Sequence, residues 1–181
     1  MMADNVTLRA MEPEDLDFLY NIENNIALWD VGTANVPFSR YLLHDYLANA
    51  SGDIYTDKQV RLIIEQRETE AGQAGAERSE ARTVGLADLT AFDPRNLRAE
   101  VGIVVRQDYR GKGVGHQALA QLTDYARRVL HLHQLYAYVD AANEVSLQLF
   151  RGAGFRDAAR LKDWVQTADG WGDVVLMQFF F

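Results

Sequence analysis

The chain contains no cysteine among its 181 residues. Disulfide bonds, catalysis by a thiolate and cysteine-ligated metal centres are therefore excluded. Only four histidines are present and none lies in an HExxH arrangement, so we expect no metal site. No apolar run is long enough to cross a bilayer, and the acidic N-terminus lacks the apolar stretch of a secretory signal. These absences predict a cytoplasmic protein with no membrane contact.

Positive charge is also scarce, since 18 Lys and Arg stand against 26 Asp and Glu and the net charge is −8. Nucleic-acid binding needs a basic surface, so we expect no nucleic-acid partner. An acidic protein is compatible with a cationic substrate such as an amine, and a plain solvated acidic surface is the alternative. The length and the 48% hydrophobic content predict one domain, residues 1–181, with a substantial core.

Local patterns predict a mixed α/β (α+β) fold rather than a doubly wound one. Seven segments have the composition or alternation of strands, namely Val6–Ala10, Gln59–Gln66, Thr83–Phe92, Ala99–Arg106, Leu135–Val139, Phe155–Val165 and Asp173–Phe181. Four segments have helical spacing, namely about twelve residues through Leu16, Leu19, Tyr20 and Ile26 with Pro13 in the first turn, a helix capped by Ser39, Val114–Leu130, and Glu144–Phe150. Glu68–Arg82 has almost no large apolar side chain, which favours a mobile hairpin loop.

The most informative stretch is Arg110-Gly111-Lys112-Gly113-Val114-Gly115, between a strand pattern and a helix pattern. Glycines let bare backbone N–H groups approach an anion, and the following helix directs the positive end of its dipole to the same place. The stretch therefore predicts a pyrophosphate site. It lacks the spacing of a Walker A loop, and its G-x-G-x-G pattern does not fit a dinucleotide fingerprint.

Arg110-x-x-Gly113-x-Gly115 resembles the Arg/Gln-x-x-Gly-x-Gly/Ala signature of the acetyl-CoA-dependent N-acetyltransferases of the GNAT superfamily. About thirty residues later, Asn143 to Phe155 resembles the family's Asn-x-x-(Ala/Ser)-x-x-(Leu/Ile)-(Tyr/Phe)-x-x-x-Gly-Phe signature, with every specified position matched. Within the superfamily, the chain most resembles the branch of spermidine and ribosomal-protein N-terminal acetyltransferases. The resemblance implies a mostly antiparallel sheet of about seven strands with about four helices, splayed between the fourth and fifth strands.

The resemblance also implies the residues that bind acetyl-CoA. The backbone of Ile103, Val104 and Val105 would pair with the pantetheine arm like an added strand, and an N–H near Val105 would polarise the thioester carbonyl. The same side chains are also expected in the core. Main-chain N–H groups from Arg110 to Gly115 (Arg110, Gly111, Lys112, Gly113, Val114 and Gly115) would hold the pyrophosphate, with Lys112 adding charge near the 3′-phosphate.

Arg110 also has an alternative role, which is an ion pair with a local carboxylate. Three further positions, Asn143, Phe150 and Arg151, belong to this expected cofactor set. Asn143 would cap the short helix and bond the pantetheine amide, and Arg151 would reach the adenosine phosphate. Phe150 stands where many family members carry a tyrosine that protonates the departing thiolate. Phe150 has no such proton, although water or another tyrosine such as Tyr138 can substitute.

Acetyl transfer needs an uncharged amine, so a carboxylate must accept a proton. Asp88 and Glu100 are the candidate catalytic residues, because both lie on adjoining predicted strands. In the spermidine-acetylating branch an acidic residue corresponds to Asp88 and meets the amine. A pair with Arg98 or Arg106 is the alternative role for Asp88, and Glu100 has the same ambiguity.

The predicted function is therefore direct transfer of acetyl from acetyl-CoA to a primary amine, in a small amine, a polyamine or a protein N-terminus. A CoA-binding sensor with little activity is the alternative, because Phe150 lacks the hydroxyl and a lost general acid costs on the order of 10²-fold in rate. The segment Leu28–Thr33 carries one carboxylate where the spermidine enzymes have paired acids, and its Trp29 either packs over the acceptor or anchors the loop. The apolar end Phe179–Phe181 fits either a homo-oligomer interface or a core edge.

Overall fold

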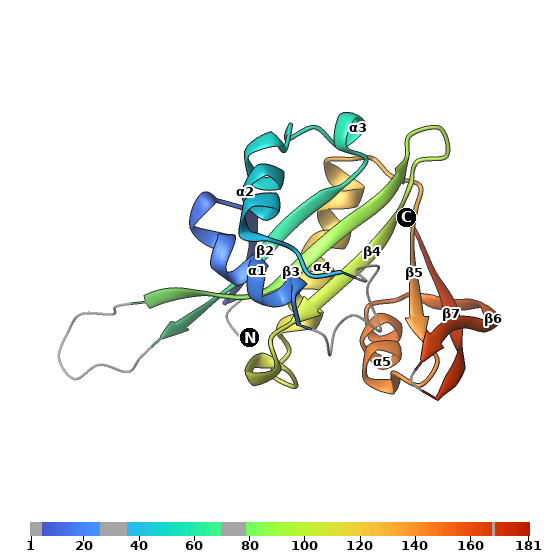
Figure 1. Cartoon of the computed structure of the whole chain (residues 1–181). Helices are drawn as coiled ribbons and strands as arrows, with labels where there is room; N and C mark the ends of the chain where they lie inside the picture. Colours follow the sequence, from blue (N-terminus) through green and yellow to red (C-terminus); the bar gives the residue numbers. More distant parts are fainter. Residues whose placement is uncertain (1–4, 26–35, 70–78, 168) are drawn as a thin grey trace.

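A computed structural model describes residues 5–25, 36–69, 79–167 and 169–181 of the chain. Seven strands form one sheet in the order β1-β2-β3-β4-β5-β7-β6 (Figure 1). The strands are β1 (Val6–Ala10), β2 (Val60–Thr69), β3 (Ser79–Asp93), β4 (Arg98–Val105), β5 (Gln134–Asp140), β6 (Arg156–Thr167) and β7 (Gly170–Phe180). The helices are α1 (Leu16–Glu23), α2 (Arg40–Asn49), α3 (Ile54–Asp57), α4 (Val114–Arg128) and α5 (Glu144–Gly152).

The pairing of β4 with β5 sets the position of the functional site. All other neighbouring strands in the sheet run antiparallel, whereas these two are parallel and are connected through α4. They pair only from Arg98–Glu100 to Gln134–Tyr136. Beyond this point β4 continues to Val105 and β5 continues to Asp140 without a shared ladder. The expected splay between the fourth and fifth strands is thus confirmed.

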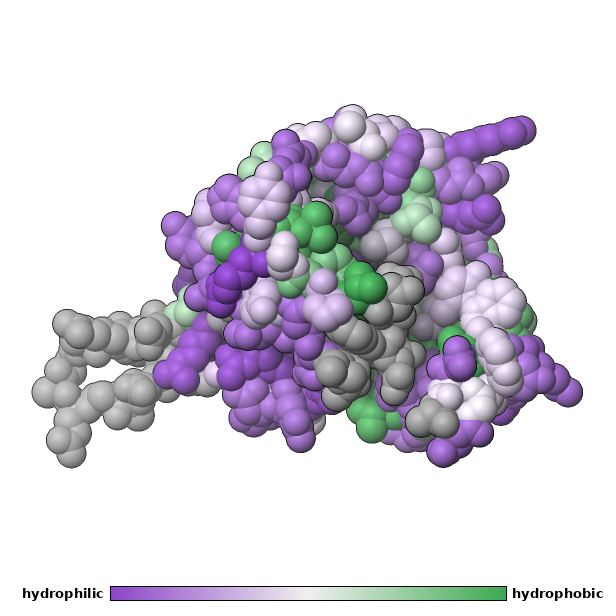
Figure 2. Space-filling model, viewed as in Figure 1, coloured by the Kyte–Doolittle hydropathy of each residue, from purple (hydrophilic) through white to green (hydrophobic). Residues whose placement is uncertain are grey.

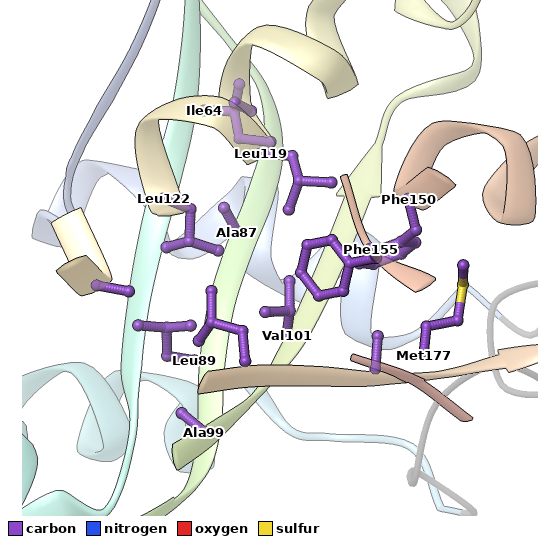
Figure 3. Close-up of a cluster of buried hydrophobic side chains, with 14 of the residues drawn as sticks. Ile64, Ala87, Leu89, Ala99, Val101, Leu119, Leu122, Phe150, Phe155 and Met177 are labelled. Carbon is purple, nitrogen blue, oxygen red and sulfur yellow. The ribbon is translucent and has the colours of Figure 1, made fainter. Parts of the chain in front are cut away.

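The two faces of the sheet are covered by different helices (Figure 1). The larger core lies between the sheet and α4, and it continues through α5 to β7 (Figure 3). Ala118 and Leu122 of α4 are completely buried there. Val129, just beyond the helix end at Arg128, is 60% exposed. A smaller cluster, Leu19, Leu43, Ile63 and Leu86, fixes α1 and α2 to the opposite face.

Helix starts follow the predicted capping chemistry. The Ser39 hydroxyl accepts a hydrogen bond from the Leu42 N–H at 3.1 Å, and α2 begins at the next residue. Pro13 opens a 3₁₀ turn that continues into α1, which ends at Glu23. Ile26 lies outside the described residues. The four-residue α3 was not expected, since only Asp53 marks its start, by accepting from the Tyr55 N–H.

The hairpin of β2 and β3 is longer than the sequence indicates. Glu68 and Thr69 pair with Glu80 and Ser79, although all four were expected in a loop. The expectation was wrong at both ends of the segment, because ladder hydrogen bonds between the two strands satisfy the backbone there. The rest of the expected loop, residues 70–78, lies outside the described part of the chain.

The C-terminal phenylalanines divide between the two expected roles. Phe179 packs against Phe155 at a ring-centroid distance of 5.3 Å, so it belongs to the core edge. Phe180 is 57% exposed and its ring lies edge-on to His133. Only the end of this segment is therefore available for another surface.

Candidate active site

A cleft of about 730 Å³ opens where β4 and β5 separate. Its lining comes from α1, α2, the strands β2, β3, β4 and β5, α5 and the β6–β7 hairpin. On the face shown in Figure 2, hydrophobic residues reach the surface near the middle, below α2, within a mainly hydrophilic surround. The cleft therefore joins the split in the sheet to the face that α1 and α2 cover.

An ion-pair network lies on the β2–β3 wall of this cleft. The register pairs Arg61 with Asp88, and both project toward the α1–α2 face with Ile63 and Leu86. The Arg61 Nε is 3.1 Å from each carboxylate oxygen of Asp88, and one terminal nitrogen is 2.9 Å from Oδ2. The other terminal nitrogen donates to Glu23 at 2.5 Å. Each nitrogen of this guanidinium thus already has a carboxylate partner.

The expected partners of Asp88 were wrong. Arg98 pairs with Asp93 at 3.2 Å and Arg106 pairs with Asp108 at 2.8 Å, both close in sequence. Asp88 instead meets Arg61, 27 residues earlier, through the strand register. Arg61 was missed by sequence reasoning, although a charged residue alternating with Ile63 in a strand pattern is a usable signal.

Burial and charge act against each other in the network. Burial raises the pKa of Asp88, and the Arg61 guanidinium opposes that rise. Burial also works against the charge of Arg61, but Asp88 and Glu23 more than compensate and raise the pKa of Arg61. The guanidinium therefore stays charged and holds the Asp88 carboxylate in a fixed orientation.

Glu100 has a different environment on the same face. Its side chain is half-buried, lines the cleft, and has neither a hydrogen bond nor an ion pair within the described parts of the chain. Burial raises the pKa of its carboxyl. Its parallel partner, Tyr136, is the last residue of β5 that pairs with β4, so Glu100 lies at the point where the split begins. An unpaired carboxylate of raised pKa can accept a proton.

The open edge of β4 follows from the alternation of its ladder. The Arg106 N–H donates to the Val84 carbonyl at 2.8 Å, so alternate residues Val104 and Gly102 face β3 in the same way. The N–H and C=O groups of Ile103 and Val105 then face the split. The Arg110 Nε donates to the Val105 carbonyl oxygen at 2.8 Å, in agreement with this direction. Arg110 thus bonds a backbone carbonyl, and the alternative of a carboxylate partner is wrong.

The glycine loop has the expected turn and helix start. Gly111 (φ 72°) and Gly113 (φ 80°) are left-handed, and Gly113 is the N-cap of α4. Gly115 lies close to α5, since a Cβ there would be 3.3 Å from the side chain of Leu149. The exposed ammonium of Lys112 lies 5.3 Å from the ring centre of Tyr109. The loop presents its backbone at the start of a 15-residue helix, which suits a phosphate group.

The second motif forms the other side of the split. The Asn143 side-chain oxygen accepts from the Ser146 N–H at 3.0 Å, so the predicted helix cap is confirmed. Phe150 is buried and lies edge-on to Phe155 with ring centres 5.0 Å apart. Arg151 pairs with Asp157 at 2.7 Å and lies 3.6 Å from Glu144. Its charge is therefore shared with local carboxylates.

The β6–β7 hairpin adds an aromatic wall that sequence reasoning missed. Trp164 of β6 lines the cleft and stacks on Tyr138 of β5 with ring centres 6.3 Å apart. No motif marks Trp164, and the β7 strand between β5 and β6 brings the two rings together only in three dimensions. The segment Leu28–Thr33, with its Trp29, lies outside the described residues.

Neither metal ligands nor membrane spans are found within the described ranges. No three His, Asp or Glu side chains there are grouped in a way that would hold a metal ion. In the same ranges, no helix is both long and apolar enough to cross a membrane.

Comparison with known proteins places these features in context. The family model described as an acetyltransferase (GNAT) domain matches residues 5–156. The chain is 27% identical over 153 residues to the spermidine N(1)-acetyltransferase of Escherichia coli (strain K12), which covers 84% of this chain and 74% of that protein. It is 29% identical over 158 residues to an L-methionine sulfoximine/L-methionine sulfone acetyltransferase of Pseudomonas aeruginosa, which covers 82% and 91%.

Solved structures show the same fold. The spermidine N-acetyltransferase from Vibrio cholerae in complex with CoA and spermine superposes with a TM-score of 0.77 at 23% identity, covering 97% of this chain and 95% of that one. A dodecameric structure of the same enzyme has a TM-score of 0.76 at 24% identity, covering 97% and 94%.

Proposed function

Because the chain belongs to the acetyltransferase (GNAT) domain family and is an acetyl-CoA-dependent N-acetyltransferase, we propose that its acceptor is a primary amine of a polyamine. The observation that carries this proposal is the charge of the cleft. Its described lining residues include four carboxylates, those of Glu23, Asp88, Glu100 and Asp140, and one guanidinium, that of Arg61. An anionic cleft favours a polycation over a neutral or anionic acceptor.

The ion pairs that Arg61 makes favour a polyamine over an amino acid as the acceptor. An amino acid would need a cation for its own carboxylate, as well as a base for its amine. Arg61 already donates from all three nitrogens to Asp88 and Glu23, so its guanidinium has little hydrogen-bonding capacity left for a substrate carboxylate. The relatives include enzymes for both kinds of acceptor, and this cleft favours the polyamine.

The residues on both sides of the split fit acetyl-CoA. The backbone of Ile103 and Val105 faces the opening, and the left-handed Gly111 and Gly113 present the loop at the α4 N-terminus. We assign the pantetheine arm to the open edge of β4 with Asn143, and the pyrophosphate to the loop from Arg110 to Gly115, with Val104 turned toward β3. Acetyl-CoA supplies the activated acetyl thioester, and an N–H of Ile103 or Val105 is positioned to stabilise negative charge on its carbonyl oxygen.

Proton removal is assigned to Glu100. A polyamine ammonium has a pKa about three units above neutral pH, as for lysine, so the reactive form must be generated in the site. Glu100 has a free carboxylate of raised pKa, whereas the Asp88 carboxylate is engaged by Arg61. We therefore assign Glu100 as the general base and Asp88 as the group that binds the ammonium.

The buried Phe150 provides no proton for the leaving thiolate. Thiols titrate near 8.5, so the thiolate leaves without full assistance at neutral pH. Tyr138 lines the same cleft and has an exposed ring, so it is a candidate donor. The alternative of a CoA-binding sensor has no support among the relatives.

The spermidine enzyme of known dodecameric structure supports self-association of this chain as well. The exposed Phe180 and Phe181 are a candidate contact. Light scattering coupled to size exclusion would test this proposal, and a monomer at micromolar concentration would overturn it.

The acceptor is tested by release of CoA thiol, which a thiol reagent reports without background because the chain has no cysteine. The panel contains spermine, spermidine, putrescine, L-methionine sulfone and a short peptide with a free N-terminus. We expect kcat/KM for spermidine to exceed that for methionine sulfone by at least about tenfold, equivalent to one lost charge contact. A preference for methionine sulfone or the peptide would overturn the assignment.

A further inference from the structure

We propose that Tyr138 and Trp164 form an aromatic subsite that binds the second, non-reacting ammonium group of the acceptor. This inference rests on the proposed polyamine function and names a recognition element for it. The two rings line the same cleft as Glu100 and Asp88. They are 43% and 56% exposed, so their faces are open to a ligand.

A local distortion of β6 directs Trp164 toward β5. The β6–β7 register shifts between Leu161 and Val165, where four positions of β6 span two of β7. Bulges of this kind bend a strand and redirect a side chain, often next to a functional site. Trp164 consequently reaches the ring of Tyr138 across the intervening strand β7.

The distortion is held in place by specific contacts. Asp163 has a φ of 50°, a left-handed conformation that is unfavourable for most residues other than glycine. Its N–H donates to the Asp173 carboxylate at 3.1 Å, and the same carboxylate is 2.7 Å from the Arg160 guanidinium. Gly172 lies opposite Val165, where a Cβ would approach the Val165 and Thr167 side chains to 3.3 and 3.1 Å. These contacts hold the bulged backbone, and with it Trp164, in one conformation.

Neighbouring side chains fix the orientation of the two rings, and no Lys or Arg of the described residues lies over either ring. Tyr136 lies edge-on to Tyr138, with ring centres 5.7 Å apart at 80°. Tyr138 and Trp164 are nearly parallel, at 19°, and stack with their ring centres 6.3 Å apart. Within the described residues, the Lys and Arg groups that lie over aromatic rings use Tyr20, Tyr46, Phe92 and Tyr109. The faces of Tyr138 and Trp164 are therefore left for another cation.

The ligand chemistry follows from the two walls together. An ammonium group binds the negative face of an indole or phenol ring, and indole binds it best. Three of the four cleft carboxylates, those of Glu23, Asp88 and Glu100, lie on the other wall, so an acceptor with two separated ammonium groups satisfies both walls at once. The fourth, Asp140, lies on β5 with Tyr138. A monoamine satisfies only the carboxylate wall.

The test compares spermidine with butylamine, which has one amine and no second charge. For Trp164→Leu we expect the KM of spermidine to rise about tenfold, with little change in kcat, in the KM of acetyl-CoA or in the KM of butylamine. Trp164→Phe should keep most of the affinity because it retains a ring. For the same reason Tyr138→Phe should keep the spermidine KM, whereas Tyr138→Leu should raise it.

Trp171→Leu is the matched control. Trp171 belongs to the same hairpin and is 66% exposed, but it does not line the cleft, so its loss should leave both KM values unchanged. Calorimetry of spermidine with the enzyme and CoA should show the same tenfold loss for Trp164→Leu, independently of turnover.

The outcomes separate the subsite from the underlying function. If wild type acetylates spermidine and Trp164→Leu affects spermidine and butylamine alike, the subsite is overturned and the polyamine function stands. A rise in the KM of acetyl-CoA instead would overturn the subsite by assigning the rings to the cofactor. If wild type acetylates no polyamine, the proposed function fails and the subsite fails with it.

Discussion

Glu100 and Asp88 lie on the same face of the sheet, but their surroundings give them different chemistry. Asp88 is clamped by Arg61, so its carboxylate is fixed and shared with a permanent cation. Glu100 has no described partner, and burial alone raises its pKa. A clamped acid suits binding of a cation and an unclamped acid suits transfer of a proton.

Replacing Glu100 by Gln should separate activity from stability. Loss of the proposed general base should lower kcat about 10²-fold. The wild-type rate should fall as the pH drops through the raised pKa of Glu100, because the protonated form cannot accept a proton. Glu100→Gln should lack this acidic limb in a pH–rate profile. A variant with the full rate and the same acidic limb would remove Glu100 from the mechanism.

The same substitution has a stability effect of opposite sign. Because the pKa of Glu100 is raised in the folded state above its ordinary 4.5, the folded state holds the proton more tightly than the unfolded chain does. Its ionised form therefore destabilises the protein above the raised pKa, and this penalty vanishes below 4.5. Glu100→Gln should have a higher Tm than wild type at neutral pH and an equal Tm near pH 4.

Restoring the missing hydroxyl tests the leaving-group step. Phe150→Tyr should raise kcat, by up to about 10²-fold if thiolate departure limits the rate. Phe150 packs edge-on to Phe155, so the added oxygen must find room at the edge of a buried ring, and Tm should fall slightly. Thiol release and thermal unfolding on the same preparations would measure both effects. An unchanged kcat would show that protonation is already supplied or is not limiting.

Residue-level prediction from sequence succeeded where a role is local. The Asn143 cap and the left-handed Gly113 follow from contacts within a few residues. Arg61 and Trp164 could not be placed this way, because their partners lie 27 and 26 residues away along the chain and are set by register and by a bulge. Sequence periodicity indicates on which face of a strand a residue lies, but it does not indicate which strand lies next to it.

At the level of elements, the packing of β4 against β3 leaves no room for a side chain at Gly85. A Cβ at Gly85 would overlap the Val104 carbonyl oxygen. Gly85→Ala should lower the free energy of unfolding by about 1–3 kcal/mol, since strand backbones cannot yield as a side chain can. It should also raise the KM of acetyl-CoA, because a shift of Val104 displaces its neighbours Ile103 and Val105, whose backbone groups lie at the open edge of β4. Urea denaturation and steady-state kinetics would measure the two effects.

Gly102→Ala is the matched control for stability. A Cβ at Gly102 would lie 3.6 Å from the Asp88 Cβ, an ordinary contact. Its free energy of unfolding should differ from wild type by less than about 0.5 kcal/mol. Equal losses for the two alanine variants would contradict the steric argument for Gly85.

Most helices and strands could be predicted from the sequence, but their lengths were predicted less well. The amphipathic pattern of α4 and the alternation of the central strands locate these elements within a few residues. The β2–β3 hairpin extends into a polar segment and α3 has four residues, so neither carries enough apolar pattern to be recognised. Backbone hydrogen bonds stabilise both, and these leave no mark in composition.

At the scale of the whole molecule, the net charge of −8 and the acidic cleft should both attract the proposed polyamine acceptor. Raising NaCl from 50 to 500 mM should raise the KM of spermidine about tenfold, because salt screens attraction beyond a few ångströms. The KM of butylamine should rise less, since it carries one charge. Steady-state kinetics at constant pH would measure both, and equal responses would count against electrostatic recognition.

The order of the sheet was not derivable from local patterns. Period-2 alternation cannot distinguish a paired strand edge from an open one, and the split between β4 and β5 was implied only by the resemblance of two motifs. The two motifs implied the split because a backbone loop and a helix cap at a fixed separation bind one extended ligand.

The open edge of β4 has a thermodynamic consequence. Hydrogen-bonding groups of Ile103 and Val105 that no neighbouring strand uses gain partners when acetyl-CoA binds, and the unfolded chain offers no such site. Linkage then adds about 2.7 kcal/mol to the free energy of unfolding when acetyl-CoA is at a hundred times its Kd. Tm measured in a titration should climb with the logarithm of acetyl-CoA concentration, and a flat response would contradict binding at this edge. The gap in the sheet makes the fraction of folded enzyme a function of metabolite supply.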